Sequence, residues 1–91
     1  MKKILHLTLC KEWFELISSG KKTTEYREIK PYWMTRLQGK EYDEIHFKNG
    51  YATDAPFMRI EWKGMTIEKW KNKNHFAIKL GKILEVKNYS I

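Results

Sequence analysis

The stretch Gly20-Lys21-Lys22-Thr23-Thr24-Glu25-Tyr26-Arg27 lies between an amphipathic segment and a segment that begins with a proline. From Thr24 onward, its side chains alternate with the period of a β-strand. Residues two apart on a strand share a face, so Glu25 and Arg27 are expected to point to the same side. Lys22 stands just before this strand. The stretch therefore predicts an ammonium, a carboxylate and a guanidinium within reach of one small volume.

Short helices are predicted on both sides of this strand. Lys11 to Ser19 carries its apolar side chains at the spacing of one helix face, and Gly20 suits the left-handed conformation that ends a helix. A second helix is predicted over Pro31 to Leu37, because proline fits the first helical position and Gly39 supplies the stop.

Alternating apolar side chains predict the remaining strands, over residues Ile4 to Cys10, Tyr42 to Lys48, Met58 to Lys63, Met65 to Trp70 and His75 to Val86. The last of these stretches is either one long strand or a pair of short ones. Asn49-Gly50 is a hairpin signal, Gly64 is predicted to form a turn, and Gly81 a bulge or bend. Tyr51 to Pro56 is predicted to be a loop. Two short helices in the N-terminal half and about five to six strands define an α+β domain. Strands with a single apolar face favour a small mixed or antiparallel sheet that curls into a β-barrel.

The composition indicates one basic globular domain over residues 1–91. The formal net charge is +7, and a basic surface attracts polyanions, above all nucleic acid. The alternative is an ordinary lysine-rich surface. Cys10 is the single cysteine, so an internal disulfide is excluded and a reducing, cytoplasmic location is expected. It is predicted to be a small core residue.

No membrane association is expected from the sequence. The apolar run from Ile4 to Cys10 is too short for the core of a signal peptide, and no stretch approaches the roughly 20 apolar residues that cross a bilayer. His6 and His46 lie on polar strand faces, where either could act as a general base. The histidines and the cysteine lack the spacing of metal ligands, so neither a metal nor another cofactor is predicted.

The helix followed by Gly20 to Arg27 resembles the G-x-K-T-x-E-x-R signature of ASCH domains, which are small members of the PUA-like superfamily. The segments Tyr42 to Phe47 and Phe76 to Gly81 also resemble later strands of that family. The resemblance implies a small β-barrel with helices at its edge, a cleft over the motif, and a role in binding RNA or a modified nucleoside.

The same resemblance implies an alternative function, because some ASCH proteins are small amidohydrolases that deacylate acetylcytidine. In those enzymes a Lys and a Thr of the motif act with a Glu from a later strand. Lys22 matches the lysine, but Glu25 stands where the catalytic threonine aligns, and Thr23 is not at that position. Glu61 or Glu68 would supply the later carboxylate. If the chain is an enzyme, Lys22 and Glu25 are therefore the expected catalytic residues.

The chemistry of the motif is suited to binding a base. Glu25, flanked by two cations, is expected to be ionised and to accept hydrogen bonds from the amino group of cytosine or guanine. Lys22 and Arg27 are suited to a phosphate or a carbonyl group. Three aromatic residues are candidates for stacking on the base: Tyr26, Trp33 and Tyr51.

Three functions remain open from the sequence. The first is a module that binds RNA or a modified nucleoside, and the second is a small hydrolase acting on an acylated nucleoside. The third is an interaction domain whose pocket is vestigial. In the last case, Glu25 and Arg27 would form only a surface ion-pair network of small energetic value.

Overall fold

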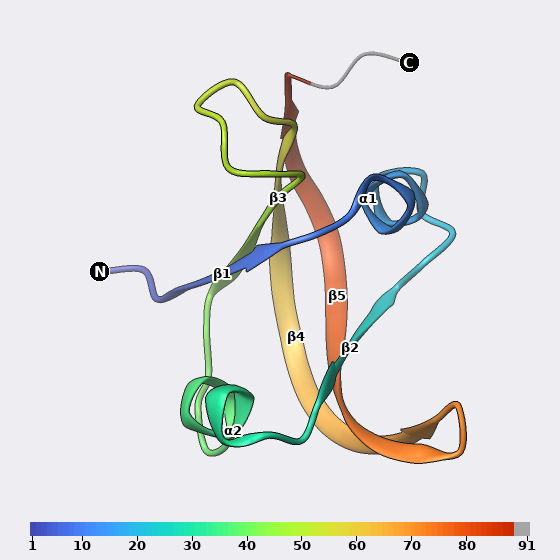
Figure 1. Cartoon of the computed structure of the whole chain (residues 1–91). Coiled ribbons are helices and arrows are strands. Elements are labelled where there is room, and N and C mark those ends of the chain that lie inside the picture. The colour runs from blue at the N-terminus through green and yellow to red at the C-terminus, as the bar shows by residue number, and fades with distance from the viewer. Residues whose placement is uncertain (89–91) are drawn as a thin grey trace.

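The computed structural model describes residues 1–88 and shows an α+β fold of two helices and one five-stranded sheet (Figure 1). The elements in chain order are β1 (Ile4–Thr8), α1 (Lys11–Ser18), β2 (Thr24–Glu28), α2 (Pro31–Leu37), β3 (Glu44–Lys48), β4 (Phe57–Trp70) and β5 (Lys73–Lys87). Both predicted helices are confirmed, and α2 has the predicted bounds. No helix among the described residues is long and apolar enough to cross a membrane.

The sheet is mixed and open. Its strand order is β1-β3-β4-β5-β2, with β1 parallel to β3 and the other neighbours antiparallel. In the pairings of the described strands, β1 and β2 each have one neighbour, so the predicted closure into a barrel is not formed. A side chain spans the seam between these edges instead, because Arg27 Nη2 on β2 donates to the Thr8 carbonyl at the end of β1, at 3.2 Å.

A long β4-β5 hairpin forms the middle of the sheet and curves along its length (Figure 1). The prediction of a turn at Gly64 is wrong, because β4 continues through this residue. Gly64 has a φ of 107° and lies where the register shifts between Trp62 and Met65, so this glycine serves a bulge. The reversal occurs at Lys71 and Asn72, whose φ angles of 52° and 62° suit a type I′ turn. One long strand therefore replaces two predicted strands.

Of two other predictions about turns, the one at Gly81 is confirmed and the one at Asn49-Gly50 is confirmed only in part. Gly81 lies between Leu80 and Ile83, where β5 carries one residue more than β4, as expected of a bulge. Asn49-Gly50 begins the connection of the antiparallel pair β3-β4. That connection is a loop over residues 49–56 rather than a two-residue turn, and Asn49 N–H donates to the Pro56 carbonyl at 2.9 Å.

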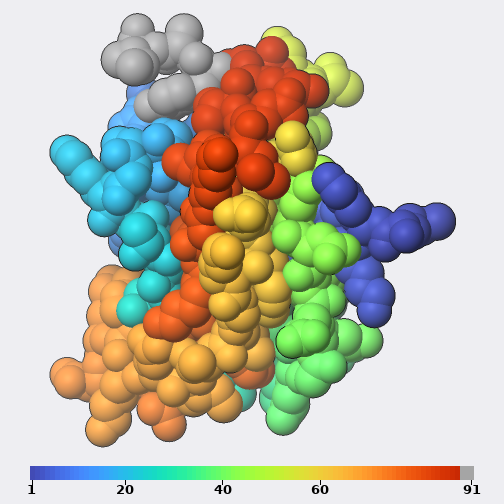
Figure 2. Space-filling model, turned by 180° about the vertical axis from the view of Figure 1, so that it is seen from behind, coloured from blue at the N-terminus to red at the C-terminus, as the bar shows by residue number. Residues whose placement is uncertain are grey.

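One apolar core joins every element except β2. Its buried members are Leu5, Leu7, Leu9, Phe14, Ile17, Leu37, Ile45, Phe47, Met58, Ile60, Phe76 and Ile78. In the rear view, β4 and β5 cover the middle of the surface from yellow to red, with β3 in green beside them (Figure 2). Strand β2 instead contributes a buried carboxylate, Glu25, at the edge of the sheet.

Candidate functional site

The three charged side chains of the opening motif meet at the seam of the sheet. Glu25 is 5% exposed. Its Oε2 accepts a hydrogen bond from Arg27 Nη2 at 2.7 Å, and its Oε1 lies 3.4 Å from Lys22 Nζ. The predicted convergence of ammonium, carboxylate and guanidinium is therefore present in the structure.

Local structure explains how Lys22 reaches this position. Gly20, with a φ of 81°, ends α1, and the backbone N–H of Lys22 donates to the Leu16 carbonyl at 3.0 Å. The Lys22 ammonium lies 4.6 Å from the ring centroid of Trp13 and 5.4 Å from that of Tyr26. These distances allow cation–π attraction, which holds the ammonium beside the carboxylate.

Arg27 links three elements at the seam. Besides Glu25, its guanidinium contacts the Thr8 carbonyl on β1, and its Cζ lies 4.9 Å from the ring centroid of Trp33 on α2. The Arg27 Nε is buried and has no hydrogen-bond partner among the described residues. The N–H at this atom is therefore unsatisfied, while the rest of the guanidinium lines the cavity described below.

Aromatic rings pack beside the charged cluster. Tyr26 stacks on Trp70 with the ring centroids 4.9 Å apart and the planes 3° from parallel. The ring of His75 meets both of these rings edge-on, at 6.3 Å from Tyr26 and 5.2 Å from Trp70. One face of the Tyr26 ring, which was predicted to stack on a base, is thus covered by Trp70.

Adjoining cavities open along this seam. The first, of about 400 Å³, is lined by Thr8, Leu9, Cys10, Trp13, Glu25, Tyr26, Arg27, Glu28, Trp33, Trp70 and His75. A second, of about 480 Å³, shares Arg27 and Trp33 with the first and adds Tyr51, whose side chain is 89% exposed on the loop after β3. A third, of about 340 Å³, is lined by Lys22 and shares Tyr26 with the first. All six predicted binding residues line one of these three cavities.

The two later glutamates considered for catalysis lie elsewhere. Glu68 pairs with Lys79 and accepts a hydrogen bond from Thr66, and Glu61 accepts one from the backbone N–H of Lys82 at 2.9 Å. Neither lines the three cavities. The second carboxylate beside the first cavity is Glu28, which is exposed.

The sequence interpretation missed several wall residues. Trp70 and His75 flank the β4-β5 turn, and they reach the site because β5 pairs with β2, with His75 opposite Glu28. Cys10 was predicted to lie in the core, which is wrong, because it is exposed and lines the first cavity. The alternation along this segment indicates the exposed position, because Cys10 falls on the same face as His6 and on the opposite face from the buried leucines.

Another hollow lies between α1 and the end of β5 and is lined by none of the three charged side chains Lys22, Glu25 and Arg27. It measures about 710 Å³ and is lined by Glu12, Glu15, Leu16, Ser18, Ser19, Lys21 and Val86. None of the described residues that line it is aromatic. The combination of buried charge and aromatic rings therefore distinguishes the seam from this hollow.

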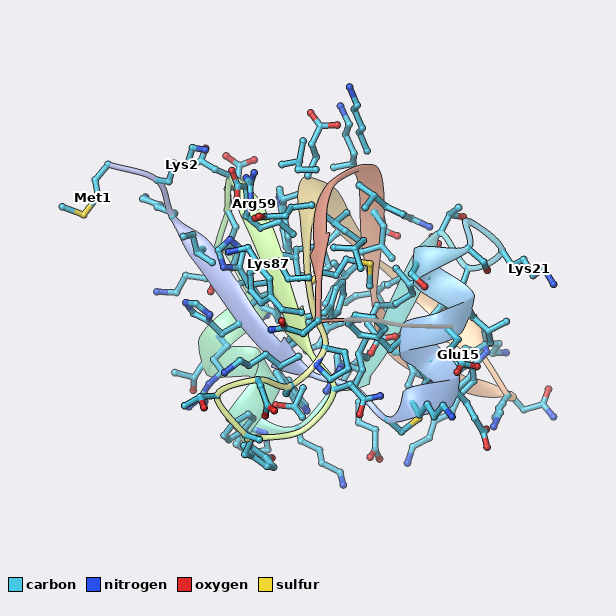
Figure 3. The ribbon with its side chains drawn as sticks, turned by 90° about the horizontal axis from the view of Figure 1, so that it is seen from above. Met1, Lys2, Glu15, Lys21, Arg59 and Lys87 are labelled. Carbon is cyan, nitrogen blue, oxygen red and sulfur yellow. The ribbon has the colours of Figure 1, made fainter. Side chains whose placement is uncertain are left out.

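A second charged cluster surrounds Glu44 on β3, which is 5% exposed. Its carboxylate lies 2.6 Å from Lys2, 2.9 Å from Arg59 and 3.1 Å from the His46 ring. Hydrogen bonds from Lys2, Arg59 and His46 lower the pKa of Glu44 to about 2. Figure 3 shows Lys2 and Arg59 close together, on the opposite side of the molecule from Lys21. This cluster ties the start of β1 to β3 and β4.

Comparison with known proteins finds no family model that matches the chain, and no curated protein or solved structure that is similar enough to count as a match. The resemblance to ASCH domains therefore depends on the motif and strands of the chain itself.

Proposed function

We propose that this chain binds single-stranded RNA or a modified nucleoside, with one unpaired base in the cavity beside Glu25 and Arg27. The proposal is carried by the buried Glu25 carboxylate, which is held between two cations at a cavity of about 400 Å³. Small-ligand cavities of roughly 300–1,000 Å³ usually combine apolar walls with a few placed polar groups. Here Trp13, Trp33 and Trp70 supply the apolar walls.

Glu25 is the group suited to recognise the base. Each carboxylate oxygen has more than one lone pair, so the contacts with Lys22 and Arg27 leave room for further donors. Cytosine and guanine present amino groups as donors, whereas the corresponding group on uracil is a carbonyl acceptor. We therefore expect cytosine or guanine to be preferred over uracil.

Arg27 is the group suited to an acceptor on the ligand. The Arg27 guanidinium lines the cavity, and its planar set of N–H donors suits a carbonyl or phosphate oxygen of the ligand. The net charge of +7 also favours a polyanion over a neutral ligand.

We further propose that the chain is an ASCH domain, with a PUA-like sheet left open at the seam. The motif over residues 20–27 supports this proposal, and so does its position at the seam cavities, where the resemblance implies a cleft. A cytoplasmic location is in keeping with the single, exposed Cys10.

Hydrolysis of an acylated nucleoside is less well supported than binding. Both oxygens of Glu25 lie against cations, and neither Glu61 nor Glu68 lines the seam cavities. Incubation with acetylcytidine tests this alternative directly. Release of cytidine that is lost in Lys22→Ala would favour the hydrolase over the binding module.

The binding proposal is tested by titrating fluorescein-labelled eight-nucleotide RNAs of cytosine, guanine or uracil, followed by fluorescence anisotropy. We expect Arg27→Ala to weaken binding about tenfold or more, because charge-assisted hydrogen bonds contribute about 1.5–3 kcal/mol. The RNA affinity of Arg27→Lys should lie between those of the wild type and Arg27→Ala, since lysine keeps the charge but loses the planar donor set. Lys82→Ala, which removes one positive charge at an exposed position away from the seam cavities, is the matched control and should change affinity less than twofold.

The salt dependence of RNA affinity distinguishes a contact between Arg27 and a phosphate from the other effects of removing Arg27. Affinity of the wild type should fall steeply as salt rises, and Arg27→Ala should reduce the slope of log affinity against log salt by about 1. Failure of all three RNAs to bind the wild type at low salt would contradict the proposed function.

A further inference from the structure

A fourth cavity continues the seam onto the outer face of β1 and β3. It measures about 270 Å³ and is lined by His6, Leu7, Thr8, His46, Lys48 and Phe57. Thr8 also lines the first and second seam cavities, so the four hollows adjoin one another along β1 and β2. A ligand that fills the base cavity therefore has a continuous path toward the two histidines.

The fourth cavity is lined by nitrogen-bearing side chains. His6 and His46 are opposite each other in the β1-β3 register, and their ring centroids are 5.4 Å apart with the planes 84° from parallel. Lys48 is opposite Thr8 in the same register, and no carboxylate pairs with Lys48 among the described residues. Two imidazoles and one ammonium thus lie on a single face.

Two acidic groups lie near this cluster, Glu44 and Glu85, and both are paired with cations. Glu44 lies 3.1 Å from His46, but it is also held by Lys2 and by Arg59, the residue opposite His46 on β4. On β5, the Lys87 ammonium lies 5.7 Å from the ring centroid of Phe57 at the edge of the same cavity. Glu85 pairs with both Lys87 and Arg59, at 3.5 Å and 3.1 Å. These two carboxylates are outnumbered by the four cations Lys2, Lys48, Arg59 and Lys87. The local balance of charge is therefore positive.

We propose that His6, His46 and Lys48 form a phosphate subsite, so that the ligand is a nucleotide chain whose phosphodiester lies here while a base occupies the Glu25 cavity. This inference depends on the proposed function, because it assigns the second part of the same ligand. The Lys48 ammonium and the ring N–H of His6 are donors suited to phosphate oxygens, with the His46 ring beside them as a wall of the subsite. Phosphate contacts supply most of the sequence-independent affinity for nucleic acid. Free nucleosides are therefore weak ligands, and the chain binds strands.

Histidine NMR reports on the two subsites separately. The described residues contain three histidines. His75 lines the base cavity, His46 lines the phosphate cavity, and His6 lines both the phosphate cavity and the second seam cavity, so His46 is the more specific reporter of the phosphate. Isotope-labelled protein is titrated with cytidine, cytidine 5′-monophosphate and the dinucleotide CpC, with the imidazole resonances recorded. We expect cytidine to shift only His75, and CpC to shift all three histidines. A larger shift of His6 and His46 with the monophosphate than with CpC would instead assign the subsite to a terminal phosphate.

The outcomes separate the two proposals. If CpC shifts His75 but leaves His6 and His46 unchanged, the phosphate subsite is wrong and the base cavity stands. If CpC shifts His6 and His46 but leaves His75 unchanged, the base cavity is wrong and the phosphate contact stands. If no histidine responds to any of the three probes, both are wrong.

A charge variant tests the subsite without relying on the histidines. Lys48→Ala should weaken CpC binding about five- to tenfold and leave cytidine affinity unchanged, because only the dinucleotide presents a phosphodiester. Lys40→Ala removes an exposed lysine that does not line the fourth cavity, and it is the matched control. Equal weakening of CpC by the two variants would overturn the assignment of Lys48, since it would show a general effect of charge.

Discussion

Glu25 shows how a single residue connects folding with binding. Its carboxylate is buried at the edge of the sheet, where most side chains of the core are apolar, and two cations compensate its charge. Buried charges are retained only where partners compensate the loss of hydration. The same compensation leaves an ionised acceptor facing an aromatic cavity.

The first prediction concerns the stability that this ion cluster provides. Glu25→Gln should lower the free energy of unfolding by about 1–3 kcal/mol, because Lys22 and Arg27 lose their common counter-ion. Urea denaturation followed by tryptophan fluorescence measures the change. Glu41→Gln, at an exposed loop position, is the control and should change stability by less than about 0.5 kcal/mol. Equal stability of the two variants would show that the cluster is energetically unimportant.

The second prediction concerns Glu44 and acid. The pKa of Glu44 falls from 4.5 to about 2 in the folded chain, so the unfolded chain binds more protons between these two pH values. Stability from this carboxylate is present above about pH 4.5 and is lost as the pH falls toward 2.

Thermal unfolding between pH 6 and pH 2 tests this dependence on pH. Glu44→Gln should flatten the fall in melting temperature between pH 4.5 and pH 2. Some slope should remain, because ion pairs also lower the pKa values of Glu68 and Glu85. An unchanged slope of melting temperature against pH in the variant would show that Glu44 does not contribute to acid unfolding.

At the scale of elements, the β4-β5 hairpin determines where the site forms. Its strands extend to 14 and 15 residues, which brings Trp70 and His75 from the turn region to the edge strand β2. The length of the hairpin depends on Gly64, which allows β4 to continue through a bulge. Without that continuity, the aromatic wall of the cavity would not reach Tyr26.

The third prediction tests this role of Gly64. Gly64→Ala should destabilise the chain by about 1–3 kcal/mol, because an L-residue is strained at a φ of 107° even though the added Cβ meets no atom within 4 Å. Lys63→Ala provides the comparison, because Lys63 is the exposed neighbour of Gly64 on β4 and its φ is not positive, so its loss of stability should be less than about 0.5 kcal/mol. Urea denaturation distinguishes the two, and equal losses in both variants would contradict backbone strain at Gly64 as the cause.

The sequence predicted local features better than distant ones. The bounds of α2 and the convergence of Lys22, Glu25 and Arg27 follow from proline placement and two-residue alternation, which are local properties. Gly64 was misassigned because glycine suits both a turn and a bulge, and the pairing of β4 with β5 decides between them. Trp70 lies at the site because of the same pairing of β4 with β5. Such a pairing joins distant residues, so it cannot be predicted from a short segment of sequence.

At the scale of the whole molecule, the open seam of the sheet is where a ligand would meet the chain. Edge strands that do not pair leave room between them, and Arg27 spans that room with one hydrogen bond to Thr8 rather than a ladder. The predicted closed barrel would have filled the same space with backbone hydrogen bonds. Basic side chains across the molecule, with a net charge of +7, would attract the polyanion that we propose as the ligand.

The four tryptophans allow the most direct test of binding at the seam. Trp13, Trp33 and Trp70 line the base cavity, whereas Trp62 packs against Tyr42, with ring centroids 5.2 Å apart. The indole N–H resonances of isotope-labelled protein are recorded as eight-nucleotide cytosine RNA is added to saturation. The account predicts that the three cavity tryptophans shift and that Trp62 does not. Shifts confined to Trp62, or no shift of any indole, would contradict a base-binding site at the seam.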